Sequence, residues 1–93
     1  MATGTATLNF SSIPSDEATV NITGLSGLSV GSHKEAFVQG DDSTGDNDAL
    51  AHKFLAVSGR FSCEYVSATE MKVYCDLLMG LATGQFTIHY ATA

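Results

Sequence analysis

Strict alternation of apolar and polar residues over residues 60–90 is the feature that most constrains how this 93-residue chain can fold. Three runs show it, and their apolar members are Phe61, Cys63 and Tyr65, then Met71, Val73, Cys75 and Leu77, then Phe86, Ile88 and Tyr90. A period of two is what a half-buried strand requires, because successive side chains point to opposite faces of a sheet. The short connections between the runs predict a three-stranded meander with tight reversals.

Two further alternating runs, residues 6–10 and 18–22, predict strands that could pair as a hairpin around Pro14. Residues 32–39 are a less regular strand candidate. Residues 1–5 are small and polar and are interpreted as a flexible N-terminal arm, which leaves a single domain over residues 6–93. About six or seven short antiparallel strands at this spacing predict an all-β sandwich or a small barrel.

Residues 49–57 fit two kinds of structure. Asp48 can cap a helix, and Leu50 and Phe54 lie four residues apart on one helical face, which predicts a short helical turn near residues 48–54. Leu55 and Val57 also alternate with polar or small residues, as a strand would require. We expect a helical turn at the start of this segment and extended backbone from Leu55.

The charge of the chain excludes several classes of partner. Its net charge is −6, and its four basic residues are scattered, so we expect no binding to nucleic acid and none to an anionic membrane. The acidity serves either solubility or docking onto a basic surface. No apolar run approaches the ~20 residues of a membrane span, and the N-terminus lacks signal-peptide features. We therefore expect a soluble protein made in a cytosol.

The two cysteines are expected to face each other. With a three-residue turn at residues 68–70, Cys63 lies opposite Cys75 on the core face of a hairpin. Opposed Cβ atoms are about 4.5–5.5 Å apart, longer than the ~3.8 Å of a relaxed disulfide. Two buried reduced thiols are the favoured interpretation and a cross-strand disulfide is the alternative. Redox or metal chemistry is not indicated, because there is no Cys-x-x-Cys motif.

No residue pattern indicates catalysis or a cofactor. Residues 40–48 form an acidic surface loop whose oxygens suit Ca²⁺, but they do not match a calcium-binding loop, because Asn47 stands where glycine is needed. A solvated loop is the simpler interpretation. The histidines show no metal-ligand spacing, and no nucleophile elbow is present. We expect a protein that is not an enzyme and has no metal or cofactor.

Part of the chain resembles small structural proteins of tailed bacteriophages. The matching features are the Thr/Asp-rich loop at residues 43–50, the Gly59-Arg60-Phe61 strand start and the closing Gly-x-Phe strand at residues 84–90, preceded by the strand and glycine at residues 20–24. The resemblance implies an Ig-like β-sandwich carried on the virion and made in the host cytoplasm. Its implied role is head decoration (cement), with the major capsid protein or another virion protein as partner. A tail, baseplate or receptor-binding module is the alternative, and self-association is compatible with either role.

A decoration protein needs contact residues rather than catalytic ones. We expect them in the N-terminal arm, in the loops at residues 25–31 and 40–48, and among aromatic residues opposite the core face, where exposed rings on a sheet favour protein contact. A second packed layer is the alternative for those aromatic residues. The candidate contacts are Met1, Ala2, Thr3, Leu25, Leu28, Asp41, Asp42, Asp46, Tyr74 and His89.

Overall fold

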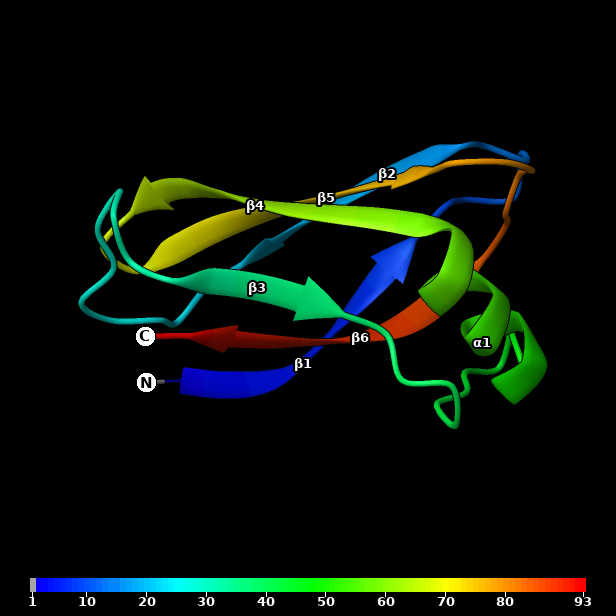
Figure 1. The fold of residues 1–93 in the computed structure, drawn as a ribbon, viewed down its shortest axis with the longest axis horizontal. Helices are drawn as coiled ribbons and strands as arrows, with labels where there is room; N and C mark the ends of the chain where they lie inside the picture. The colour runs from blue at the N-terminus through cyan, green and yellow to red at the C-terminus, as the bar shows by residue number, and fades with distance from the viewer. Residues whose placement is uncertain (1) are drawn as a thin grey trace.

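A computed structural model describes residues 2–93, which form two small antiparallel sheets and one helix (Figure 1). In chain order the elements are β1 (Ala2–Asn9), β2 (Glu17–Ile22), β3 (Lys34–Phe37), α1 (Ala49–Ser58), β4 (Gly59–Ser67), β5 (Glu70–Leu77) and β6 (Gln85–Thr92). One sheet has the strand order β1-β6-β3 and the other has β2-β5-β4. The sheets lie over each other, and α1 covers one end (Figure 1). The predicted all-β sandwich is confirmed.

The core lies between the two sheets and is filled mainly by the apolar members of the alternating runs in β1, β2, β5 and β6, whereas Phe61 and Cys63 of β4 are only partly buried and Tyr65 is exposed. Met71 and Val73 of β5 and Leu8 and Ile88 of the other sheet are fully buried. The rings of Phe10 and Phe86 meet edge to face, with their centroids 5.6 Å apart. The alternation therefore identified the buried face of β5 and β6 correctly, because one sheet face is covered and the other is not.

The predicted strand pairing is only partly right. β4 and β5 form the expected hairpin, but β6 leaves that sheet and pairs with β1 in the other one. β1 and β2 lie in different sheets, so the hairpin around Pro14 is also wrong. The β1–β2 connection and the β5–β6 connection instead each cross from one sheet to the other. The two connections also pair with each other, because Ser15 and Ala82 exchange backbone hydrogen bonds of 3.0 and 2.9 Å.

The flexible arm is a further correction. Residues 2–5 form the first half of β1, whose register runs from Ala2 opposite Thr92 to Asn9 opposite Gln85. Gly4 has a local reason to be glycine, since a Cβ atom there would lie 2.6 Å from the Tyr90 hydroxyl oxygen. Met1 lies outside the described residues.

The helix begins as expected and continues further. The Asp48 carboxylate accepts a hydrogen bond from the Ala51 backbone N–H at 2.9 Å, which confirms the predicted N-cap. The extended segment predicted from Leu55 is wrong, because α1 runs to Ser58 and buries Leu55 against the core. Strand β4 starts at the next residue, Gly59, where a Cβ atom would lie 2.8 Å from the Leu55 carbonyl oxygen. Glycine thus allows helix and strand to follow each other directly.

The register of the β4–β5 hairpin separates the two cysteines. Cys63 lies opposite Val73, and Phe61 lies opposite Cys75, because the turn is shorter than expected and an irregularity follows Tyr65. Both thiols are free, so the cross-strand disulfide is wrong. A shift of two residues preserves the face of every side chain, which is why Cys75 is still buried in the core.

Candidate functional site

Strand β6 is central in its sheet, and its backbone groups alternate between two neighbours. Phe10 donates its backbone N–H to the Gly84 carbonyl at 2.9 Å, and Ala93 donates to the His33 carbonyl at 3.0 Å. Even-numbered residues of β6 therefore bond to β1 and odd-numbered residues bond to β3. Because β3 ends at Phe37, opposite His89, the odd-numbered residues Thr87 and Gln85 have no strand beside them.

Side chains of residues 44–52 replace the missing strand. The Thr87 backbone N–H donates to His52 Nε2 at 2.9 Å, and the Gln85 N–H donates to Asp46 Oδ2 at 2.9 Å. The Gln85 carbonyl accepts from Thr44 Oγ1 at 2.6 Å and from Asn47 Nδ2 at 2.9 Å. The acidic loop is therefore bonded to β6. Its polar side chains provide hydrogen-bond partners for backbone groups of β6 that would otherwise have none.

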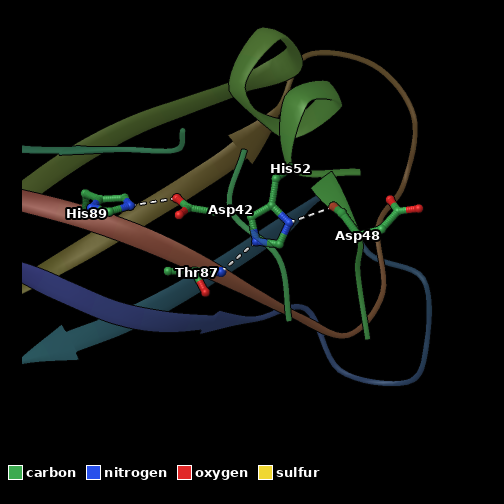
Figure 2. A network of polar contacts seen from close by, with 5 residues as sticks. All are labelled: Asp42, Asp48, His52, Thr87 and His89. Carbon is green, nitrogen blue, oxygen red and sulfur yellow. Dashed lines mark hydrogen bonds and ion pairs between the residues drawn. The ribbon is translucent and has the colours of Figure 1, made fainter. Parts of the chain in front are cut away.

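His52 links the helix to the sheet. Its Nε2 accepts a hydrogen bond, so the ring proton lies on Nδ1, which donates to the Asp48 carbonyl at 3.0 Å (Figure 2). The ring is fully buried, and its centroid lies 5.0 Å from that of Phe86. Both ring nitrogens are engaged by the backbone, so His52 has a structural role.

His89 and Asp42 form a second link on the same side of β6. His89 Nε2 and Asp42 Oδ2 are 2.6 Å apart (Figure 2). The His89 ring also stacks on that of Phe37, with the ring centroids 5.6 Å apart. Their side chains are only 22% and 19% exposed. The sequence predicts that both residues contact a partner, whereas the structure shows them in contact with each other.

The outer face of α1 carries an apolar groove. Leu50, Phe54 and Val57 point away from the core and, with Leu81, line an open groove of about 730 Å³. The segment that contains Leu81 lies against the helix, since a Cβ atom at Gly80 would lie 3.6 Å from the Phe54 ring. Leu78 and Met79 of this segment are also exposed, and the Leu78 backbone N–H donates to the Ser58 carbonyl at the end of α1 at 2.8 Å. The helix-end patch is defined as Leu50, Phe54, Val57, Leu78, Met79 and Leu81, each between 49% and 79% exposed.

The groove has few polar side chains, and most of them already form hydrogen bonds within the protein. Asn47, Asp48 and Lys53 line it beside the apolar side chains. The Asp48 carboxylate caps α1 and Asn47 holds Gln85, which leaves Lys53 as the one charged group of the lining without such a bond in the described residues. An open apolar surface with a sparse polar border has the character of a protein-contact site.

None of the nine described residues that we expected to contact a partner belongs to this patch. Leu25 and Leu28 are buried in the core, which corrects their assignment as contacts. Their backbone N–H groups bond to Thr69 and Ala68, which ties this loop to the β4–β5 turn. The polar candidates differ in position: Thr3 and Asp41 are exposed, while Asp46 is exposed but bonded to β6.

Tyr74 lies on the outer face of the β2-β5-β4 sheet. Its hydroxyl donates to Glu64 Oε1 at 2.8 Å, and that hydrogen bond raises the pKa of Tyr74. The Lys72 ammonium lies 5.1 Å from the centre of the ring. This small polar cluster lies on the outer face of that sheet and includes no residue of the helix-end patch.

A sequence signal for the patch existed. The helix has apolar residues on two faces, with Leu55 on the buried one and Leu50, Phe54 and Val57 on the other. The four-residue spacing of Leu50 and Phe54 predicts a helical turn but does not say which of its faces is buried. Apolar residues on both sides of a short surface helix indicate a second partner surface.

The described residues offer little for catalysis or metal binding. Within residues 2–93, no three His, Cys, Asp or Glu side chains gather in a way that could hold a metal ion. Burial raises the pKa of both thiols, that of Cys75 to about 12, so each is protonated at neutral pH and a weak nucleophile. No helix in this part of the chain is long and apolar enough to cross a membrane.

Comparisons with protein-family models, with curated proteins and with solved structures find no match to this chain.

Proposed function

We propose that this protein is a non-enzymatic virion structural protein, a capsid decoration protein that binds the assembled phage head through the helix-end patch. The patch is the observation that supports a protein-binding role. The choice of a phage head as the partner rests on the sequence resemblance to small structural proteins of tailed bacteriophages.

The size and composition of the patch favour a protein partner. Single exposed apolar side chains are common on monomers, but four large ones lining one groove, with two more exposed in the adjoining segment, are not. Burial of apolar surface contributes roughly 25 cal/mol per Å², so covering several of these side chains supplies several kcal/mol toward association. A partner that places its own apolar side chains in the groove would gain this energy.

The patch is also held in place before any partner arrives. Helix α1 is capped by Asp48 and bonded through His52 to Thr87, and residues 44–47 are bonded to Gln85. A rigid contact surface loses little conformational entropy on binding, which favours tight association for a given area. The polar loop thus serves the interface indirectly, by fixing the helix that presents it.

The test is co-sedimentation of the purified protein with heads assembled from the major capsid protein of the same genome. We expect binding at a fixed number of copies per shell, and we expect Val57→Asp to reduce it at least tenfold. The matched control is Val30→Asp, because Val30 and Val57 are both 79% exposed but Val30 lies outside the patch.

The outcomes separate the two parts of the proposal. A wild-type protein that does not sediment with heads overturns the decoration role, and sedimentation with purified tails would assign it to the tail or baseplate instead. Binding to heads that Val57→Asp leaves unchanged overturns the helix-end patch as the contact surface while retaining the decoration role.

A further inference from the structure

The four edge strands of the sandwich are protected to different degrees. β3 has only four residues, of which Lys34 and Glu35 are charged. β4 carries Arg60 and Glu64 and an irregularity after Tyr65, and β2 starts at Glu17. Short length, charge and bulges are the devices by which proteins keep sheet edges from pairing with other chains.

β1 has none of these devices. It spans eight residues, Ala2–Asn9, with no charged residue and no proline, and it forms the edge of its sheet opposite β3 (Figure 1). Its register with β6 is regular over its full length. In a chain with a net charge of −6, a strand of this length without any charge is an open template for another strand.

The register identifies which backbone groups point outward. The Phe10–Gly84 hydrogen bond continues the β1–β6 register, so the even-numbered residues of β1 bond to β6. The N–H and C=O groups of the odd-numbered residues Thr3, Thr5 and Thr7 therefore face away from the sheet. Their side chains are exposed, while those of Ala2 and Ala6 pack against the core.

We propose that β1 pairs antiparallel with β1 of a second copy of this chain and so forms a two-fold symmetric dimer. With the symmetry axis at Thr5, Thr5 faces its own copy and Thr3 faces Thr7 of the other copy. Every residue in these pairs is odd-numbered, so outward N–H groups meet outward carbonyls in both directions. The two sheets then join into one six-stranded sheet.

The side chains also suit this pairing. Cross-strand threonine pairs stabilise antiparallel strands, and the pairing brings three of them together on the exposed face. β1 carries no charged side chain, so the paired strands place no like charges opposite each other. Because the protein pairs through the same edge in both copies and its other edges are protected, the assembly closes as a dimer.

The first experiment is sedimentation equilibrium of the purified full chain over a wide concentration range. We expect the mass to rise with concentration from 9.7 kDa to about twice that value. Thr5→Lys places two ammonium groups at the symmetry axis and is expected to weaken dimerisation at least tenfold. Thr19→Lys is the matched control, since Thr19 is an exposed threonine on the edge strand β2.

The second experiment tests the backbone directly. Thr5→Pro removes an outward N–H, which an edge strand tolerates, and is expected to abolish the dimer. In wild-type protein, the Thr5 amide is expected to exchange slowly at high concentration and quickly on dilution, whereas the Ala6 amide, bonded to β6, stays protected in both conditions.

Either of two results would overturn the proposal. A wild-type protein that remains at 9.7 kDa up to millimolar concentration has no such dimer, and its β1 edge would be left for a strand of another protein. A dimer in which Thr5→Lys and the Thr5 amide exchange show no effect uses another surface. Neither result bears on head binding through the helix-end patch, so the two proposals fail separately.

Discussion

The two edges of the β1-β6-β3 sheet differ in whether their outward backbone N–H and C=O groups are hydrogen-bonded. Beyond the end of β3, the outward backbone groups of β6 are bonded to His52, Asp46, Thr44 and Asn47. At the other edge, the outward backbone groups of Thr3, Thr5 and Thr7 have no hydrogen-bond partner within residues 2–93. The first edge is closed by the chain itself and adds to stability, and the second is open and available for association.

The comparison therefore makes opposite predictions for the two edges. Substitutions at the closed edge should lower the free energy of unfolding, because they leave buried N–H or C=O groups without partners. Substitutions at the open edge should change association and leave the monomer intact.

His52→Ala should have the largest effect. It removes a fully buried ring and leaves the Thr87 N–H unpaired, so we expect the free energy of unfolding to fall by about 4 kcal/mol. His52→Gln should lose less, because its amide oxygen can accept from Thr87. The measurement is urea unfolding, with the exposed residue His33 mutated to alanine as the control. A loss below about 1 kcal/mol for His52→Ala, the typical value for any substitution, would contradict the closed edge.

Gly84→Ala should have the next largest effect. Gly84 and Gly24 both have φ of +77°, but a Cβ on Gly84 would lie 2.7 Å from Asp46 Cβ, whereas nothing lies within 4 Å of one on Gly24. We expect Gly24→Ala to cost about 1 kcal/mol from backbone strain alone, and Gly84→Ala about 2 kcal/mol. Thermal unfolding of both variants gives the comparison. Equal losses would show that the Asp46 contact contributes nothing.

Asp42→Asn should have a smaller effect on the same edge. It removes the charge that faces His89, and because both side chains are only partly buried we expect a loss of about 0.5 kcal/mol. The control is Asp41→Asn, which makes the same charge change at the exposed neighbouring residue. Urea unfolding at low and at high salt measures the pair, and its contribution should shrink as salt rises. A loss that salt does not change would indicate a packing effect instead.

Thr5→Lys at the open edge should have the smallest effect on stability. The side chain is exposed, so we expect the free energy of unfolding measured at low protein concentration to change by less than about 0.5 kcal/mol. The measurement is urea unfolding of variant and wild-type protein at concentrations where both are monomeric. A larger loss would mean that Thr5 supports the monomer, which would remove the contrast between the two edges.

The sequence by itself determined the local features of this protein. Alternation located the strands at residues 61–65, 71–77 and 86–90 and identified Met71 and Ile88 as buried. Asp48 marked the start of the helix. These features depend on residues within one element, because the period of a strand and the cap of a helix are local properties.

Only the tertiary structure decided how the elements pair. Alternation predicts that a strand has one apolar face, but it does not say which neighbour lies beside it, so β5–β6 and β1–β2 were wrongly joined. The first residues of β1 have too little apolar surface to predict a strand, and they are ordered by hydrogen bonds to β6. Leu25 and Leu28 lie in a loop whose burial depends on its bonds to the β4–β5 turn.

In the helix-end patch, too, the sequence predicts local features and the tertiary structure decides which of them come together. Leu50 and Phe54 were correctly placed on one helical face, but which face packs on the core depends on where Leu55 and His52 meet the sheet. Leu81 joins the patch from a segment some thirty residues away along the chain. A contact surface assembled from distant segments has no signature in any one of them, because sequence patterns report neighbours along the chain and an interface is made of neighbours in space.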